Sequence, residues 1–161
     1  MNEDKKIFSL VYIFDRNEQI LLGLKKRGLG EGLWNGFGGK LMKNEIIENC
    51  AIREVHEECG LIVELEDLIK IAEIKFRFLN SNKIFEQHVF KTYKFSGEVF
   101  ESEEMRPKWF YKSSLPPYHQ MWLDQEFWHH LMFKNYKFKG DFLLDGFKQV
   151  LRYEIKLLND F

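Results

Sequence analysis

The chain has 161 residues, 45% of them hydrophobic, which suffices for one well-buried domain but leaves no room for a second catalytic one. Its 24 basic and 25 acidic residues give a net charge of -1, which argues against a surface for a nucleic-acid polymer and favours a small charged ligand. The charged N-terminus and the lack of an apolar run of about 20 residues argue against a signal peptide or a membrane span. We therefore expect a cytoplasmic, monomeric protein with a single domain over residues 1–161.

The first half of the chain predicts a hairpin followed by a helix. Two apolar runs, 7–14 and 19–25, are joined by a polar turn and read as paired strands. A helix should then run from Asn44, a good N-cap, to about Cys59. Gly60 suits the left-handed residue that ends many helices.

The second half predicts further strands and one more helix. Strands are expected at 71–79 and 86–95. A helix should begin near Asp124, whose side chain can cap it. A last hairpin should join 138–144 to 147–157 through a two-residue type I′ turn, for which Asp145-Gly146 is a strong signal. Together these elements predict an α/β fold with a mixed sheet and two helices.

Residues 39–61 carry seven residues at a fixed spacing. A chance match to this pattern is expected less than about once in 10^7 start positions. Turning 100° per residue places the three glutamates of its EVHEE run within about a third of a turn, on the side of the helix that also carries apolar residues. The seven residues are Gly39, Glu45, Arg53, Glu54, Glu57, Glu58 and Gly60.

Acidic side chains gathered beside apolar ones predict a divalent cation. Mutual repulsion and desolvation would otherwise neutralise them. Hard carboxylate oxygens without a His or Cys cluster favour Mg2+, with Mn2+ as the alternative. The glycine-rich run 36–39 precedes the helix and lets the backbone approach a metal or phosphate oxygens. This combination predicts a hydrolase in which water attacks a phosphorus of a diphosphate.

The pattern at 39–61 is the Nudix box, and the chain resembles Nudix hydrolases. Over nearly its full length it is similar to the mammalian-type MutT-like family that hydrolyses oxidised purine nucleoside triphosphates. That similarity is carried by residues 21–28, 32–40, 103–110 and 121–124. The resemblance implies a Nudix α/β/α sandwich with a mixed central sheet. It also implies Mg2+-dependent cleavage of a substrate such as 8-oxo-dGTP to the monophosphate and pyrophosphate, which would sanitise the nucleotide pool.

The resemblance also assigns roles to individual residues. Metal contacts fall on Glu54, Glu57, Glu58, Glu104 and the Gly38 carbonyl. Glu57 or Glu58 is the expected proton acceptor. Arg53 stands four residues before Glu57 and is suited to orient the Glu57 carboxylate. The substrate-binding positions are Ser9, Lys25, Asn35, Phe37, Gly38, Gly39, Lys40, Phe76, Met105, Trp122, Asp124 and Gln125.

Three positions depart from the family pattern around the base. The family carries two consecutive acids after its pocket tryptophan, whereas this chain has Asp124 followed by Gln125. An amide has a fixed donor and acceptor, so it cannot redistribute a proton between two oxidised bases, and we expect a narrower base range. Leu123 replaces a proline, and Leu29 stands where the family has an aromatic residue.

Other functions fit the box alone. Another Nudix hydrolase could act on a dinucleoside polyphosphate, a nucleotide sugar or a capped RNA end. Trp122, Asn35 and Asp124 favour a purine mononucleotide, because an indole can stack on a base and the polar groups can read its edge. A nucleotide-binding sensor without hydrolysis would be expected to lose box acids, and all of them are present.

Overall fold

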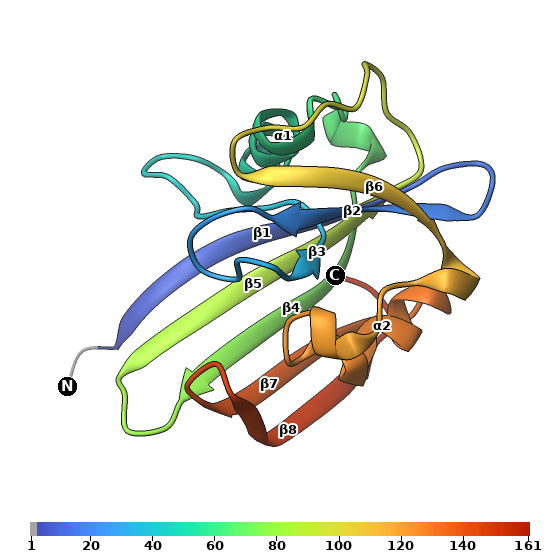
Figure 1. The fold of residues 1–161 in the computed structure, drawn as a ribbon. Helices are drawn as coiled ribbons and strands as arrows, with labels where there is room; N and C mark the ends of the chain where they lie inside the picture. The colour runs from blue at the N-terminus through green and yellow to red at the C-terminus, as the bar shows by residue number, and fades with distance from the viewer. Residues whose placement is uncertain (1–2) are drawn as a thin grey trace.

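A computed structural model describes residues 3–161 (Figure 1). The expected domain also includes Met1 and Asn2, which lie outside the described residues. Two α-helices, α1 (Ile47–Cys59) and α2 (Gln125–Phe133), accompany a mixed eight-stranded sheet within the described part of the chain. The strands are β1 (Asp4–Phe14), β2 (Gln19–Lys25), β3 (Trp34–Asn35), β4 (Ile69–Phe78), β5 (Lys83–Thr92), β6 (Met105–Tyr111), β7 (Lys137–Asp145) and β8 (Gln149–Leu158).

The sheet is the middle layer between the two helices. Its order is β3-β2-β1-β5-β4-β7-β8, with β6 also paired to β2, and the β1–β5 and β4–β7 pairs are parallel. Alternate side chains of β1 enter different cores: Val11 and Ile13 pack with α1, whereas Leu10 and Tyr12 pack with α2. This α/β/α arrangement with a mixed sheet confirms the predicted fold class.

Strands β1 and β2 separate from each other along their length. They pair only where the hairpin closes, at Ile13–Leu21 and Phe14–Ile20. The glycine-rich run 36–39 occupies the space that opens beside β1. The Phe37 backbone exchanges hydrogen bonds of 2.7 and 2.9 Å with Val11, and the Ser9 amide donates to the Gly39 carbonyl at 2.9 Å. The run therefore lies against the centre of the sheet.

Both helices form where predicted, but their N-terminal caps differ from the prediction. Helix α1 begins at Ile47, and Asn44 adopts a left-handed conformation with φ 63°, which asparagine tolerates. Gly60 ends the helix with φ 82°, as predicted. Asp124 precedes α2 but makes no capping hydrogen bond, because its carboxylate accepts a hydrogen bond from the indole of Trp128 instead.

The predicted hairpins are present, and the last loop is longer than expected. Strand β7 ends at Asp145 and β8 begins at Gln149, so three residues connect them and the two-residue turn is wrong. Phe147, predicted to start a strand, lies in this loop. Strands β4 and β5 begin two and three residues before their predicted starts, at Ile69 and Lys83. Short β3 and the whole of β6 were not predicted.

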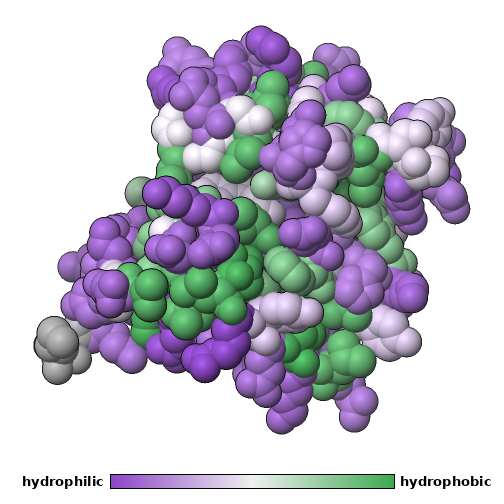
Figure 2. All heavy atoms as spheres, turned by 60° about the horizontal axis from the view of Figure 1, so that its bottom comes forward, coloured by the Kyte–Doolittle hydropathy of each residue, from purple (hydrophilic) through white to green (hydrophobic). Residues whose placement is uncertain are grey.

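The surface mixes hydrophobic and charged areas. Figure 2 brings forward the lower side of Figure 1, where β7, β8 and α2 lie, and hydrophobic residues form patches there among hydrophilic ones. The exposed hydrophobic residues of the last hairpin are Phe147, Leu151, Tyr153 and Leu157. Within residues 3–161, no helix combines the length and the apolar character needed to cross a membrane.

Candidate functional site

Helix α1 and the glycine-rich run form one side of a polar cavity, the acid cleft. It has a volume of about 460 Å³. A loop from between β5 and β6 forms the other side and adds further acidic residues. The lining residues are Lys25, Gly38, Gly39, Lys40, Glu54, Glu57, Glu58, Ser102, Glu103 and Glu104. The structure thus brings together the five residues predicted to contact metal.

Glu58 is the most buried acid of the cleft. Its exposed fraction is 3%, and its Oε1 accepts a hydrogen bond of 2.7 Å from the Gly38 amide. Burial raises the pKa of Glu58 to about 8, although the Gly38 hydrogen bond opposes the shift. Burial also raises the pKa of Glu54, against the effect of Arg53. Without a cation, Glu58 therefore favours its protonated form at neutral pH.

Arg53 is the centre of an ion-pair network along α1. Its guanidinium holds Glu45 through two hydrogen bonds of 2.7 and 2.9 Å and Glu54 through one of 2.8 Å. The predicted contact with Glu57 is present but longer, at 3.3 Å. The hydrogen bonds from Arg53 to Glu45 lower the pKa of Glu45 to about 2. Arg53 thus orients Glu54 more tightly than Glu57. Through Glu45 it also anchors the start of the helix, and the sequence analysis had assigned no such role to Glu45.

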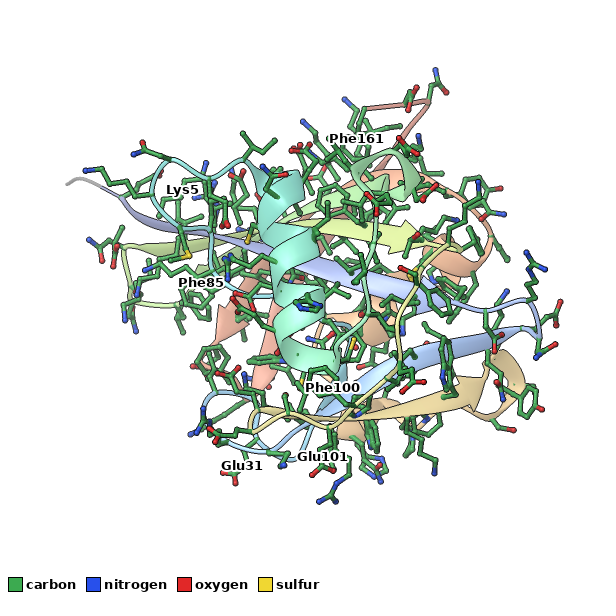
Figure 3. The ribbon with its side chains drawn as sticks, turned by 90° about the horizontal axis from the view of Figure 1, so that it is seen from above. Lys5, Glu31, Phe85, Phe100, Glu101 and Phe161 are labelled. Carbon is green, nitrogen blue, oxygen red and sulfur yellow. The ribbon has the colours of Figure 1, made fainter. Side chains whose placement is uncertain are left out.

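The loop that carries Glu104 is held by its own ion pairs. Glu101 accepts hydrogen bonds of 2.8 Å from both Lys26 and Arg106. The Lys26 amide also donates to the Glu104 carbonyl at 2.8 Å. Figure 3 shows Glu101 at one edge of the sheet, beyond the end of α1 where Phe100 lies. The Glu104 side chain lies 3.7 Å from the Lys25 ammonium, so a basic and an acidic group share this edge of the cleft.

The chemistry of the cleft fits a divalent cation. Within residues 3–161, no three acidic, histidine or cysteine side chains already surround one ion-sized point, so the acids form an open wall. Their donors are hard oxygens, and burial raises the pKa of both Glu54 and Glu58, a penalty that a bound cation would offset. Gly39 leaves room for Glu54, since a Cβ at this position would overlap its carboxylate. An open wall of this kind leaves coordination positions for water and phosphate oxygens.

An aromatic pocket adjoins the acid cleft. Its volume is about 250 Å³, and aromatic rings form a continuous chain along one wall. Between ring centroids, Phe85 lies 5.2 Å from Phe8 and 5.0 Å from Phe78. The centroid of Phe147 lies 5.4 Å from that of Phe78 and 5.6 Å from that of Trp122. Such a wall suits a flat aromatic ligand.

Four residues line both cavities, and they mark the junction. Gly38 and Gly39 come from the glycine-rich run, Lys25 ends β2, and Glu58 comes from the last turn of α1. A Cβ at Gly38 would overlap the backbone of Ser9, so only glycine allows the chain to lie this close to β1. A single ligand can therefore extend from the pocket into the cleft past one short segment.

Two buried polar residues of the pocket, Asp124 and Gln125, lie at the start of α2. Asp124 has an exposed fraction of 5%, and its Oδ2 accepts a hydrogen bond of 2.7 Å from Trp128. Burial raises the pKa of Asp124 to about 6. Gln125 is also buried, and its Nε2 donates a hydrogen bond of 2.5 Å to Asn35. Asp124 thus keeps one carboxylate oxygen free of side-chain partners, whereas Gln125 is tied to another pocket residue.

Most of the residues predicted to bind substrate line one of the two cavities. Phe37 does not, because its side chain is fully buried in the core with α1. The cause is the alternation of an extended segment, which turns Phe37 to the face opposite that of its neighbours Gly36 and Gly38. The predicted residues of the aromatic pocket are Ser9, Lys25, Asn35, Gly38, Gly39, Phe76, Met105, Trp122, Asp124 and Gln125, and Lys40 lines the acid cleft.

One further expectation changes in the structure. Glu57 does not share the inward side of the helix with Glu58, since its side chain is 56% exposed. It still lines the acid cleft, so its exposure gives it access to solvent. The sequence analysis also missed several pocket residues. Alternation along β1, β4, β5 and β7 could have identified Phe8, Leu10, Phe78, Phe85, Gln87 and Leu144, whereas Phe147 lies in the loop between β7 and β8.

Comparisons with known proteins agree with this geometry. Residues 5–131 match the NUDIX domain family. An oxidized purine nucleoside triphosphate hydrolase from Danio rerio is 40% identical over 155 residues, which cover 96% of this chain and 97% of the relative. The corresponding hydrolase from Mus musculus is 38% identical over 156 residues, with 97% of each chain covered. A crystal structure of a MutT protein from Bacillus halodurans has a similar fold, with a TM-score of 0.79 and 22% identity over 94% of this chain and 97% of that one.

Proposed function

Because the chain belongs to the Nudix family, we propose that it is a Nudix hydrolase that cleaves oxidised purine nucleoside triphosphates. The products would be the nucleoside monophosphate and pyrophosphate, and the substrate class includes 8-oxo-dGTP. The names of the relatives from Danio rerio and Mus musculus support this substrate class, since each aligns with at least 96% of the chain. We further propose that the protein acts as a monomer and that residues 1–161 form one catalytic domain.

The main support for this proposal is that the two cavities meet at Gly38, Gly39 and Glu58. A purine ring in the aromatic pocket would place its triphosphate over these residues and into the acid cleft. Trp122 offers an indole face for stacking, and Lys25 offers a positive charge at the junction. A hydrolase for diphosphates in general would need the cleft but not the aromatic pocket.

The chemistry divides between a cation and the side chains of the cleft. We propose that Glu54, Glu57, Glu58, Glu104 and the Gly38 carbonyl would hold Mg2+, or Mn2+ in its place. When bound, the cation would screen the charge that develops on the phosphate oxygens and lower the pKa of a water molecule. Glu57 has the solvent access needed to accept a proton from the attacking water. Arg53 would hold Glu54 in a fixed orientation through the 2.8 Å hydrogen bond.

Product analysis tests the reaction. Purified protein is incubated with 8-oxo-dGTP and Mg2+, and the products are separated by anion-exchange chromatography. The proposal predicts equal amounts of 8-oxo-dGMP and pyrophosphate, and no turnover in the presence of EDTA. Release of single phosphate, or turnover that is independent of metal, would contradict the proposed reaction.

A further inference from the structure

A buried polar network lies behind Asn35, a residue of the aromatic pocket. Its side-chain oxygen Oδ1 accepts three hydrogen bonds from different parts of the chain. The Gly36 amide donates at 2.8 Å, the Gln125 Nε2 at 2.5 Å and the Tyr12 hydroxyl at 3.2 Å. Strand β1, the glycine-rich run and helix α2 therefore converge on one oxygen atom.

The backbone donor fixes the orientation of the Asn35 amide. A backbone N–H can only donate, so the group that faces Gly36 must be the oxygen. Turning the amide around would place two donors against each other and leave the Gly36 amide without its acceptor. The amine Nδ2 remains without a protein partner in the described structure, and Asn35 lines the pocket. Asn35 can therefore offer a ligand a donor but not an acceptor.

Tyr12 and His129 extend the network into the core. They also fix which group donates and which accepts in each of its hydrogen bonds. Both are buried, with exposed fractions of 0% and 1%, and the Tyr12 hydroxyl lies 3.1 Å from His129 Nε2. Because Tyr12 donates to Asn35, its oxygen must accept from His129, which places the imidazole hydrogen on Nε2. Burial lowers the pKa of His129 to about 3, so the ring is neutral and carries only this one hydrogen. Nδ1 of His129 is then an unprotonated, buried atom with no hydrogen-bond partner.

Gln125 completes the network with its amine. The Asn35 oxygen fixes this side chain as well, because only Nε2 can donate to it. The Gln125 oxygen Oε1 is buried and has no hydrogen-bond partner in the described structure. An acidic residue at position 125 would set a carboxylate oxygen against the Asn35 oxygen. Gln125 therefore supports the observed direction of the network, which an ionised acid would oppose.

We propose that Tyr12, Gln125 and His129 are positioning residues that hold the Asn35 amine toward the pocket, so that the site selects purines that present a carbonyl oxygen to Asn35. An amino group at the same place on the base would put donor against donor. This inference rests on the proposed function and adds a selection rule for the base: 6-oxo purines are preferred over 6-amino purines. The three residues act through Asn35 and are not required to contact the ligand.

Kinetics with two matched substrates test the selection rule. 8-Oxo-dITP and 8-oxo-dATP share sugar and triphosphate and differ at C6, which bears an oxygen in one and an amino group in the other, and in the protonation of N1. We expect kcat/KM of the wild type to favour 8-oxo-dITP by about fivefold or more, the effect of one hydrogen bond. Equal values for the two substrates would overturn the rule.

Two variants test the positioning residues. Gln125→Glu keeps the shape of the side chain and reverses its polarity toward Asn35, and Tyr12→Phe removes one donor. Both should reduce the 6-oxo preference at least about threefold. Tyr118→Phe is the matched control, because Tyr118 also packs against the His129 ring, at 5.6 Å, but lies outside the network. A loss of stability with an unchanged preference in both variants would show a purely structural role and overturn the proposal.

A measurement without substrate separates this inference from the proposed function. In 15N NMR of the wild type at neutral pH, His129 should carry its hydrogen on Nε2. In Tyr12→Phe that nitrogen loses its partner and its signal should shift, whereas Tyr118→Phe should leave it in place. A hydrogen on Nδ1 would contradict the network even if oxidised purines prove to be substrates. If oxidised purines are not hydrolysed but the Nε2 tautomer is found, the network stands and the proposed function fails.

Discussion

The acid cleft and the aromatic pocket adjoin each other but are built from different parts of the chain. Most of the cleft comes from residues 38–58, with one loop around Glu104 added. The pocket takes side chains from β1, β4 and β5 and from the loops that carry Trp122 and Phe147. The cleft is an open wall of carboxylates, whereas the pocket is lined by aromatic rings. The difference suggests that the reaction depends on one local segment and that base selection depends on the assembly of the whole sheet.

Glu57→Gln should have the largest effect, because it removes a charge from the cleft without disturbing the core. The side chain is 56% exposed, so folding should be unchanged. We expect kcat for 8-oxo-dGTP to fall at least about 100-fold, as for loss of a general base or a metal ligand. Glu48→Gln, in the first turn of the same helix but outside the cleft, should retain normal kcat. An active Glu57→Gln protein would contradict the assignment of the cleft.

Trp122→Ala should act on the other region and on a different kinetic constant. Loss of a stacking surface is expected to raise KM roughly tenfold or more and to change kcat much less. Trp109, which packs against Phe95 in the core with α1, provides the control. Trp109→Ala should lower stability but leave KM near the wild-type value. A fall in kcat with an unchanged KM in Trp122→Ala would show that the two regions do not divide the work in this way.

Glu58 links the cleft to the pH dependence of stability. Its pKa is about 8 in the folded protein and 4.5 when unperturbed, so between these values the folded state holds a proton that the unfolded state has released. The resulting stabilisation is complete below 4.5 and is lost as the pH rises toward 8. In metal-free protein, the Tm of the wild type relative to Glu58→Gln should therefore fall by about 5 °C or more over this range. Added Mg2+ should reduce this fall in relative Tm. If the Tm of the wild type and of Glu58→Gln changed in parallel with pH in the absence of metal, the account would be contradicted.

Phe147→Ala should have the smallest effect of the four. Its ring is 47% exposed and contacts Trp122 and Phe78, so it closes one end of the aromatic wall. We expect KM to rise about two- to tenfold with kcat unchanged. Tyr136→Ala, which removes an equally exposed ring away from the pocket, should not alter KM. A Phe147→Ala protein with wild-type KM would show that the loop between β7 and β8 does not contribute to binding.

The two regions also differ in how far the sequence could predict them. The acids of α1 lie at fixed spacings on one helix, so their gathering followed from local geometry. Phe37 was predicted to bind substrate but is buried in the core with α1, because its direction depends on how the glycine-rich run pairs with β1, a contact that the sequence does not specify locally. Tyr12 and His129 lie 117 positions apart and meet only in the folded core. Asp124 does lie at the start of α2, but its carboxylate accepts a hydrogen bond from the Trp128 side chain and not from the backbone amides of the helix that it was expected to cap.

The most direct test of the account is kcat/KM of the wild-type protein for 8-oxo-dGTP, 2-hydroxy-dATP and unmodified dGTP, each with Mg2+. We predict the highest value for 8-oxo-dGTP, a lower one for 2-hydroxy-dATP because Gln125 cannot redistribute a proton, and a much lower one for dGTP. Equal values for the two oxidised substrates would show that Gln125 does not narrow the base range. Equal values for 8-oxo-dGTP and dGTP would contradict the central claim that the aromatic pocket selects oxidised purines for hydrolysis in the acid cleft.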